Sequence, residues 1–246
     1  MNAILQAQRA AEQARNLVVF SGAGLSAESG LATFRDKGEG LWQQYDPMEL
    51  ASLDGFQRDP ELVLKWYQWR RMKHREAMPN PAHHAIASSG ALNVTQNVDH
   101  LLEGAGVDAE RIAHLHGSIM SNRCHQSCGW EGVVDLEENP IPGACPNCGA
   151  RTRPTIVWFG ESLPQEALQR AAAWCTQADC LLVVGTSGVV QPAASLVGMA
   201  RESGAVVIDV NPTPSMHAGL ADILVPASAA VAIPEILSAR QASQSQ

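Results

Sequence analysis

Four of the six cysteines in this chain stand in two close pairs, a spacing that is typical of a metal site. Cys124 and Cys128 form a C-x3-C pair, and Cys145 and Cys148 form a C-x2-C pair further along the chain. Two such pairs bring four thiolates within reach of one tetrahedral zinc ion, which then has no open position for catalysis. The spacing therefore predicts a structural zinc site, with disulfides or free thiols as the alternative.

A candidate catalytic base is His116, which directly follows the apolar run 112–115. Imidazole is suited to removing a proton near neutral pH, although a lone histidine is more often a structural residue. Parallel strands end at one edge of a sheet, so polar residues that follow other apolar runs would gather beside His116 and favour catalysis. Six residues stand in such positions: Gln96, Asn97, Asp99, Gly185, Thr186 and Ser187.

A glycine-rich turn follows the first apolar run, residues 17–20, and contains Gly22, Gly24 and Gly30. A strand that leads into such a turn brings backbone N–H groups close to a phosphate, and glycine has no Cβ to hold the ligand away. The spacing is G-x-G-x-x-x-x-x-G rather than G-x-G-x-x-G, and no acidic residue stands where a ribose contact is usual. We predict a nucleotide-binding turn that differs from that of an ordinary dehydrogenase.

The elements that must position these residues alternate between strand-like and helix-like segments. Strands are expected at 17–20, 91–95, 112–115, Cys180–Val184, 205–210 and Ile223–Val225, with an extended segment at 155–159. Helices are expected at the N-terminus, at 60–74, from 80 onward and at 164–174; segment 26–29 is expected to open a helix, and 36–59 to be a long loop. This alternation predicts an α/β fold, a Rossmann-like parallel sheet with helices on both faces, plus a small zinc-binding domain.

Composition limits the classes of function. With 246 residues, of which 46% are hydrophobic, the chain can bury a large core. The net charge of −8 argues against broad binding to nucleic acid, which needs a basic face. The sequence has no apolar run of membrane-spanning length and no signal-peptide pattern, so we expect no membrane partner and a cytoplasmic location.

The motifs occur in the order found in sirtuins, the NAD-dependent protein deacylases, and the chain resembles that family over about residues 17–234. The resemblance is carried by GAGLSAESGLATFR, TQNVDHLLEGAG, HLHGS, the paired cysteines, TIVWFGESLP, GTSGVVQPAA and VIDVNP. It implies a Rossmann-like NAD-binding domain at 1–120 and 154–246 and a zinc-binding module at 121–153. Segment 36–80 would contribute to the small domain and to the acyl pocket.

The same resemblance implies the reaction and its site. NAD would be consumed as a co-substrate, and the second substrate would be an acyl-lysine in a protein or peptide. The acyl oxygen would attack the ribose carbon of NAD as nicotinamide leaves, and His116 would then take a proton from a ribose hydroxyl, giving O-acyl-ADP-ribose. The residues implied to contact NAD are Gly22, Ala23, Gly24, Ser26, Thr33, Phe34, Arg35, Trp42, Gln96, Asn97, Asp99, Gly185, Thr186, Ser187, Asn211 and Ala229.

The choice of acyl group depends on Tyr67 and Arg70, which share one face of helix 60–74. In an unknown helix this pair would be a core tyrosine beside a surface arginine. Together with Ala51, however, it matches the bacterial and mitochondrial subgroup of sirtuins, class III, that removes succinyl and malonyl groups. An arginine and a phenol bind a distal carboxylate, and a small alanine leaves room for a longer acyl chain.

The peptide itself is expected to pair with an extended segment by β-augmentation, which demands little of the peptide sequence. By resemblance this segment consists of Val157, Trp158, Phe159, Gly160 and Glu161. Alternatives within the family are an enzyme that is mainly a deacetylase and a mono-ADP-ribosyl transferase. Alternatives of other classes are an NAD-dependent oxidoreductase and a zinc-ribbon module that binds nucleic acid.

Overall fold

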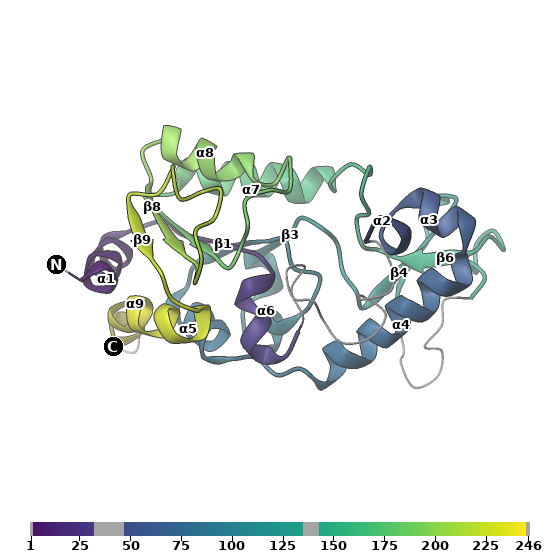
Figure 1. The fold of residues 1–246 in the computed structure, drawn as a ribbon, viewed down its shortest axis with the longest axis horizontal. Helices are drawn as coiled ribbons and strands as arrows, with labels where there is room; N and C mark the ends of the chain where they lie inside the picture. The colour runs from purple at the N-terminus through teal and green to yellow at the C-terminus, as the bar shows by residue number, and fades with distance from the viewer. Residues whose placement is uncertain (1, 32–46, 135–142, 245–246) are drawn as a thin grey trace.

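The computed structural model describes residues 2–31, 47–134 and 143–244 of the chain. Across these residues, the main element is a six-stranded sheet with the order β3-β2-β1-β7-β8-β9 (Figure 1). All neighbouring strands in it are parallel. The strands are β1 (Leu17–Ser21), β2 (Leu92–Thr95), β3 (Ile112–His114), β7 (Cys180–Val184), β8 (Val206–Val210) and β9 (Ile223–Val225).

The strand order reverses direction between β1 and β7, which lie side by side at the centre of the sheet. Val19 in β1 lies opposite Asn93 of β2 on one side and Leu182 of β7 on the other. In doubly wound sheets the ligand binds outside the carboxyl ends of the strands, at this point of reversal. The topology therefore predicts that the turns after β1 and β7 flank the binding site.

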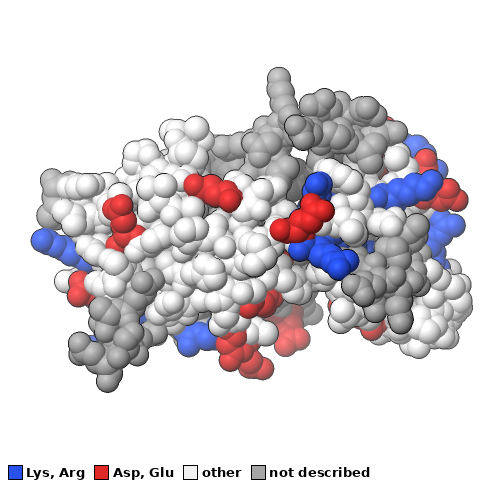
Figure 2. Space-filling view, turned by 90° about the horizontal axis from the view of Figure 1, so that it is seen from below, with Lys and Arg blue, Asp and Glu red and all other residues white. Residues whose placement is uncertain are grey.

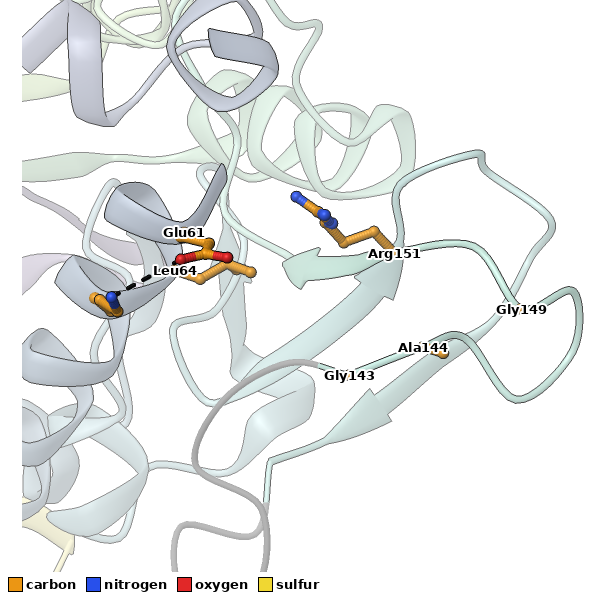
Figure 3. Close-up of a pocket in the computed structure, with 7 residues that line it drawn as sticks. Glu61, Leu64, Gly143, Ala144, Gly149 and Arg151 are labelled. Atoms are coloured by element: carbon orange, nitrogen blue, oxygen red, sulfur yellow. Dashed lines mark ion pairs between the residues drawn. The ribbon is translucent and has the colours of Figure 1, made fainter. Parts of the chain in front are cut away.

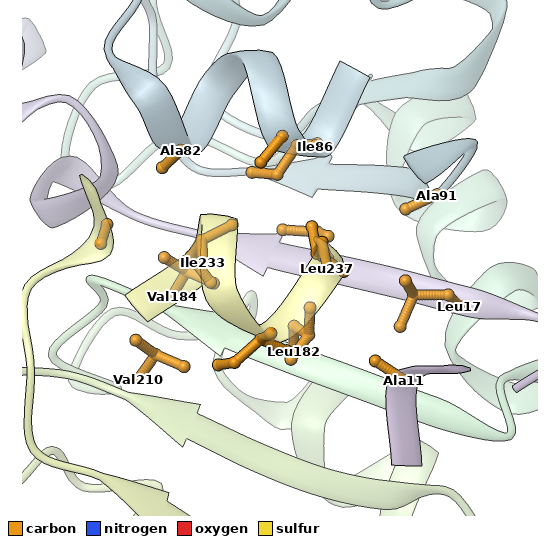
Figure 4. Packing of buried hydrophobic residues seen from close by; sticks show 14 of the residues in the cluster. Ala11, Leu17, Ala82, Ile86, Ala91, Leu182, Val184, Val210, Ile233 and Leu237 are labelled. Carbon is orange, nitrogen blue, oxygen red and sulfur yellow. The ribbon is translucent and has the colours of Figure 1, made fainter. Parts of the chain in front are cut away.

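Helices cover both faces of the large sheet (Figure 1). One layer consists of α1 (Ala3–Gln13), α5 (Pro81–Ser89) and α9 (Ala229–Gln244), and the other of α7 (Gln165–Gln177) and α8 (Ser195–Glu202). Figure 4 shows the first layer, in which Ile233 and Leu237 of α9 pack against Leu182 of β7. Because both faces are covered, every residue of β1 and β7 is buried.

Helix starts follow from side chains that cap them. α4 (Pro60–Glu76) begins after Asp59, whose Oδ1 accepts a hydrogen bond from Leu62 N at 3.0 Å. At α5, the Asn80 side chain accepts from Ala82 N at 2.9 Å, and His83 Nδ1 accepts from Asn80 N at 3.2 Å. Both helices have a proline in the first turn, where the missing backbone N–H would have no partner within the helix. These caps fix where each helix starts and hence which side chains face the site.

A smaller antiparallel sheet lies at the far end of the molecule from the chain termini (Figure 1). Its order is β5-β4-β6, with β4 (Ser121–Cys124), β5 (Glu131–Val133) and β6 (Thr152–Pro154). Beside it lie α2 (Pro47–Leu50), α3 (Leu53–Arg58) and α4, which share a third apolar core that includes Phe56, Tyr67 and Trp158. The remaining short elements are η1 (Ala23–Leu25), η2 (Ala27–Ser29), α6 (Leu101–Gly104) and η4 (Ala109–Arg111).

The predicted fold class is confirmed, and the strand bounds of the large sheet differ from the predicted ones by one residue at most. Segment 26–29 does not open a helix but forms part of two 3-10 turns, because the Ser26 hydroxyl bonds to Asp99 and does not cap a helix. The predicted loop 36–59 contains α2 and α3 in its described part. These short helices bury too few side chains to show a hydrophobic period.

No helix in the part of the chain that the structure describes is both long enough and apolar enough to cross a membrane.

The turns after β1 and β7 touch through their backbones. Gly24 N donates to Gly185 O at 2.8 Å, and a Cβ on Gly24 would lie 2.6 Å from Gly185 Cα. A Cβ on Gly22 would lie 2.8 Å from Thr186 Cβ. Gly185 itself has φ +61°, a left-handed conformation that glycine adopts at little cost. These glycines therefore have a role within the protein besides leaving room for a ligand.

We expect Gly24→Ala to lower the free energy of unfolding by about 1–3 kcal/mol, the usual cost of forcing an extra methyl group into a packed site. The matched control is Gly198→Ala within α8, where the added Cβ meets no atom within 4 Å and the helix should gain up to about 1 kcal/mol. Urea unfolding followed by circular dichroism measures both changes. Equal effects of the two substitutions would contradict the close contact between the turns.

Candidate active site

The residues predicted to bind the nucleotide follow the carboxyl ends of the large-sheet strands. Gln96 connects two of these ends, because its N donates to Ser21 O at 2.9 Å and its Nε2 donates to Thr186 Oγ1 at 2.9 Å. Together with the contact between Gly24 and Gly185, these bonds join the turns after β1, β2 and β7. The structure thus brings this group of sequence-predicted residues together.

His116 lies at the same edge, after β3, and is partly buried. Its Nδ1 lies 2.9 Å from Gln96 O, a carbonyl that can only accept, so Nδ1 carries the proton and Nε2 is free to act as a base. Burial lowers the pKa of His116 below its ordinary value of 6.5, against an opposing effect of the Gln96 carbonyl. The imidazole is therefore neutral at pH 7 and ready to accept a proton.

Ser26, Asn97 and Asp99 form a buried hydrogen-bonded group below this edge. Ser26 Oγ donates to Asp99 Oδ2 at 2.9 Å and accepts from Asn97 Nδ2 at 3.1 Å. His83 Nε2 lies 3.4 Å from the same hydroxyl, and burial lowers the pKa of His83 to about 4. The sequence prediction did not include His83; its spacing from Asn80 is a signal for the helix cap and not for the contact with Ser26.

The residues expected to hold the adenosine half lie further along the edge. Met216 N donates to Ser187 O at 2.9 Å, which connects the loop after β8 to the turn after β7. Asn211 begins that loop, and its N donates to Val225 O at 3.2 Å. Ala229 starts α9 and is buried.

Glu28 ties the start of α9 to the glycine turn. Its Oε2 accepts from Ala230 N at 2.7 Å and its Oε1 from Ser228 Oγ at 2.8 Å. Ala229 is thereby kept beside the turn that follows β1. Four other predicted nucleotide contacts lie outside the described residues: Thr33, Phe34, Arg35 and Trp42.

Residues 157–159 run extended next to His116 outside the named strands, with an isolated parallel bridge between Phe159 and Ser52, and the chain then turns at Gly160, which has φ +86°. Val157 N donates to His116 O at 2.9 Å, and Phe159 N donates to Ala51 O at 2.9 Å. Trp158 N donates to Glu161 Oε2 at 2.9 Å, and Glu161 N donates to Trp158 O at 3.0 Å. Most N–H groups of the segment are thus already used within the protein. A peptide that pairs with it would meet mainly its remaining carbonyl groups.

Tyr67 and Arg70 lie on one face of α4, as the spacing predicted. Tyr67 is fully buried, and Arg70 is partly exposed with its Cζ 4.8 Å from the centre of the Trp66 ring. Among the described residues, no carboxylate lies within ion-pair distance of Arg70. Burial lowers the pKa of Arg70, and Tyr67 and Asp99 partly oppose this effect.

The cysteine pairs converge as predicted. The four Sγ atoms of Cys124, Cys128, Cys145 and Cys148 all lie within 4.8 Å of one another. Four sulfurs at about 2.3 Å from one zinc ion would be about 3.8 Å apart, so the geometry fits a closed tetrahedral site. None of the four is in a disulfide, so that alternative is wrong.

Two buried arginines connect the two parts of the molecule and were not predicted. Arg71 is fully buried and donates to Ile119 O at 2.6 Å and Asn122 Oδ1 at 2.7 Å, which fixes α4 to the chain that enters β4. Burial lowers the pKa of Arg71 to about 10. Arg153 in β6 packs 3.8 Å from the Trp158 ring and pairs with Glu161. The partners of Arg71 lie 48 and 51 positions away along the chain, so Arg71 has no local sequence signal, whereas Glu161 is only 8 positions from Arg153.

A groove of about 620 Å³ lies elsewhere, between α4 and the cysteine module (Figure 3). Glu61 and Leu64 line it from α4, and Gly143, Gly149 and Arg151 line it from the other side. It includes none of the residues predicted to bind the nucleotide or the acyl group.

Comparison with known proteins agrees with this geometry. A profile described as the Sir2 family matches residues 22–192. The NAD-dependent protein deacylase 1 of Pseudomonas aeruginosa is 51% identical over 213 residues, which are 82% of this chain and 84% of that protein. The NAD-dependent protein deacylase 2 of Pyrobaculum aerophilum is 46% identical over 228 residues, 91% of this chain and 90% of its own length.

Solved structures share the fold. A Sir2 homologue in complex with NAD superposes with a TM-score of 0.89 at 40% identity, covering 97% of this chain and 94% of its own. A Sir2 protein bound to a myristoylated histone peptide has a TM-score of 0.77 at 32% identity, covering 99% and 98%.

We expect the purified protein to contain one zinc ion per chain, held by the four converging cysteines. Cys128→Ala should abolish this content, whereas the control Cys175→Ala, a buried cysteine outside the cluster, should keep it. Without metal, amides of β4 and β6 should exchange hydrogen faster while those of β1 and β7 stay protected. Metal analysis and hydrogen-exchange mass spectrometry measure this. A metal-free protein with a fully protected small sheet would contradict the assignment.

Proposed function

This chain belongs to the Sir2 family and is an NAD-dependent protein deacylase, and we propose that it removes succinyl and malonyl groups from lysine, with parallel or weaker removal of acetyl groups. The observation that carries the proposal is Arg70, a guanidinium beside Tyr67 with no carboxylate partner among the described residues. An arginine guanidinium in this situation is suited to bind a ligand that carries a carboxylate.

The surroundings of Arg70 favour an anionic acyl group. In the third core, Glu161 is shared by Arg123 at 3.1 Å and by Arg153, while Arg71 binds only neutral oxygens among the described residues. Cationic groups thus exceed anionic ones near Tyr67, and this excess would attract a distal carboxylate. Ala51 is small and buried, and its carbonyl accepts from Phe159 N. It leaves space next to the segment that the peptide would meet.

NAD is the co-substrate, and the strand-edge residues have a chemistry that suits it. The glycine turn after β1 has room for a backbone approach to phosphates, and Gln96, Asn97 and Asp99 offer amide and carboxylate groups for a nicotinamide. Ser187, Asn211 and Ala229 would lie along the adenosine half. When bound, NAD supplies an electrophilic ribose carbon from which nicotinamide departs.

His116 would serve as the general base of the reaction. Its Nδ1–H is held by Gln96 O, so Nε2 can take a proton from a ribose hydroxyl. Val157 N donates to the carbonyl of His116 and so keeps the peptide-binding segment next to the base. The zinc ion, enclosed by four cysteines, would hold β4 and β6 in place and take no part in chemistry.

We also propose that 1–120 and 154–246 form the NAD-binding domain, that 121–153 form the zinc-binding module and that 36–80 contribute to the acyl pocket. The separate six-stranded and three-stranded sheets support this division. A cytoplasmic location is proposed because paired cysteines that bind metal suit a reducing compartment.

Acidic and basic side chains are interspersed over the face shown in Figure 2, and no basic surface spans it. With the net charge of −8, this favours a protein substrate over nucleic acid. An oxidoreductase would produce absorbance of reduced nicotinamide during turnover, and a deacylase would not.

The proposal is tested with NAD and matched acetyl-, succinyl- and malonyl-lysine peptides, with products read by mass spectrometry. Arg70→Met should lower the ratio of desuccinylation to deacetylation in kcat/KM by about tenfold to hundredfold, because a charge-assisted hydrogen bond is worth about 1.5–3 kcal/mol. Lys73→Met, an exposed cation on the same helix, is the control and should leave the ratio unchanged. Equal loss of both activities in Arg70→Met would contradict the proposal that Arg70 selects the acyl group.

The pH dependence of kcat/KM should report His116. Because burial lowers the pKa of His116 below 6.5, the base form persists to lower pH, and activity should fall only as pH drops below about 6.5. His116→Ala should lose activity by at least about a hundredfold. The control His84→Ala removes an exposed histidine of α5 and should keep the wild-type profile. An acid limb centred above pH 7 would contradict this role.

A further inference from the structure

We infer that Trp158 is a positioning residue for acyl choice: its indole N–H holds the Tyr67 hydroxyl so that the phenol proton points to the acyl carboxylate. This inference rests on the proposed preference for succinyl and malonyl groups. It gives Trp158 a side-chain role that is separate from any pairing of its backbone with a peptide.

The contact itself is direct and buried. Trp158 Nε1 donates to the Tyr67 hydroxyl oxygen at 2.8 Å, and the exposed fraction of the Trp158 side chain is only 2%. The two rings are stacked, with centres 6.2 Å apart and an interplanar angle of 28°. Residues 91 positions apart in the sequence thus share one hydrogen bond away from water.

The bond determines what the phenol can do. A tyrosine hydroxyl has one proton, and here its oxygen already accepts from Trp158. Among the residues that the structure describes, the Tyr67 proton has no acceptor. Burial raises the pKa of Tyr67 above 10.0, so the proton is retained. A hydroxyl that accepts one hydrogen bond donates a stronger one, so Tyr67 is prepared to donate to an incoming oxygen.

The oxygen that accepts from Tyr67 would belong to a carboxylate, because Arg70 beside Tyr67 is a cation that attracts an anionic group. The Arg70 Cζ lies 5.6 Å from the centre of the Tyr67 ring, so both groups are within reach of one small anion. A neutral acetyl group has no carboxylate to offer this pair. The Trp158 bond should therefore matter for succinyl-lysine more than for acetyl-lysine.

Trp158 is itself held from two sides. The Arg153 guanidinium packs 3.8 Å from the ring centre, and Glu161 Oε2 accepts from Trp158 N at 2.9 Å. Arg153 also pairs with Glu161, and Arg123 donates to the same carboxylate at 3.1 Å. The position of the indole N–H is thus fixed by groups from β4 and β6, outside the acyl pocket.

The test compares wild type, Trp158→Phe, Tyr67→Phe and the double variant, with kcat and KM measured for acetyl- and succinyl-lysine peptides. Trp158→Phe should lower the succinyl-to-acetyl ratio of kcat/KM by about three- to tenfold, mainly through a higher KM for the succinyl peptide. In the Tyr67→Phe background the same substitution should leave the ratio unchanged, because the hydroxyl it positions is gone. Trp69→Phe on α4 is the control and should keep the wild-type ratio.

If Trp158→Phe does not fold, Arg153→Met is tested in its place. This substitution removes the guanidinium that packs on the Trp158 ring but leaves the indole N–H of Trp158 present. Arg153→Met should lower the succinyl-to-acetyl ratio of kcat/KM in the wild-type background. In the Tyr67→Phe background it should leave this ratio unchanged. A purely structural role would lower both activities equally and leave the ratio unchanged, which would overturn the inference. A wild type that does not remove succinyl groups would overturn the proposed function. A succinyl-to-acetyl ratio that falls in Arg70→Met but stays at the wild-type value in Trp158→Phe and Arg153→Met would overturn only the role of Trp158.

Discussion

The site depends on one backbone contact, that between Gly24 and Gly185 where the strand order reverses. The two turns approach so closely that a Cβ on Gly185 would lie 2.4 Å from Gly24 C. Only with this approach can Gln96, which follows the neighbouring strand, donate to Thr186 and present its carbonyl to His116. The tautomer of His116 thus depends on Gln96, which is held by Ser21 of β1 and by Thr186 after β7. The positions of Gly22 and Gly24 in the first turn allow this close packing against the turn after β7.

A second constraint positions the helix that would choose the acyl group. α4 is fixed not by apolar packing alone but by Arg71, a buried cation that donates to carbonyl and amide oxygens of the chain entering β4. Burying such a charge among neutral acceptors is costly, and the hydrogen bonds of Arg71 offset part of this cost while they fix the position of α4. Because β4 ends at Cys124, the bonds of Arg71 connect α4 to the strand that carries one of the four cysteines of the metal site.

The sequence allowed prediction of features that depend on local signals. Apolar runs located the strands, Pro60 after Asp59 located the start of α4, and the cysteine spacing located the metal site. Features that depend on distant partners could not be predicted. His83 joins Ser26, and Trp158 joins Tyr67, across 57 and 91 positions of the chain, and neither pairing leaves a mark on the neighbouring residues. α2 and α3 were missed because one or two buried side chains make no period.

The extended segment from Val157 to Phe159 connects His116 to the residues proposed to bind the acyl group. Its three successive residues contact three different parts of the site: Val157 holds the backbone of His116, Trp158 holds the Tyr67 hydroxyl, and Phe159 holds the carbonyl of Ala51. An extended chain turns alternate side chains to opposite sides, so Trp158 can enter the small core while its neighbours face elsewhere. A shift of this segment would therefore move His116 and the Tyr67 hydroxyl together. The distance between His116 and Tyr67 therefore depends on the backbone geometry of residues 157–159. Under the proposed function, a longer acyl group would then be accommodated by the residues around Ala51.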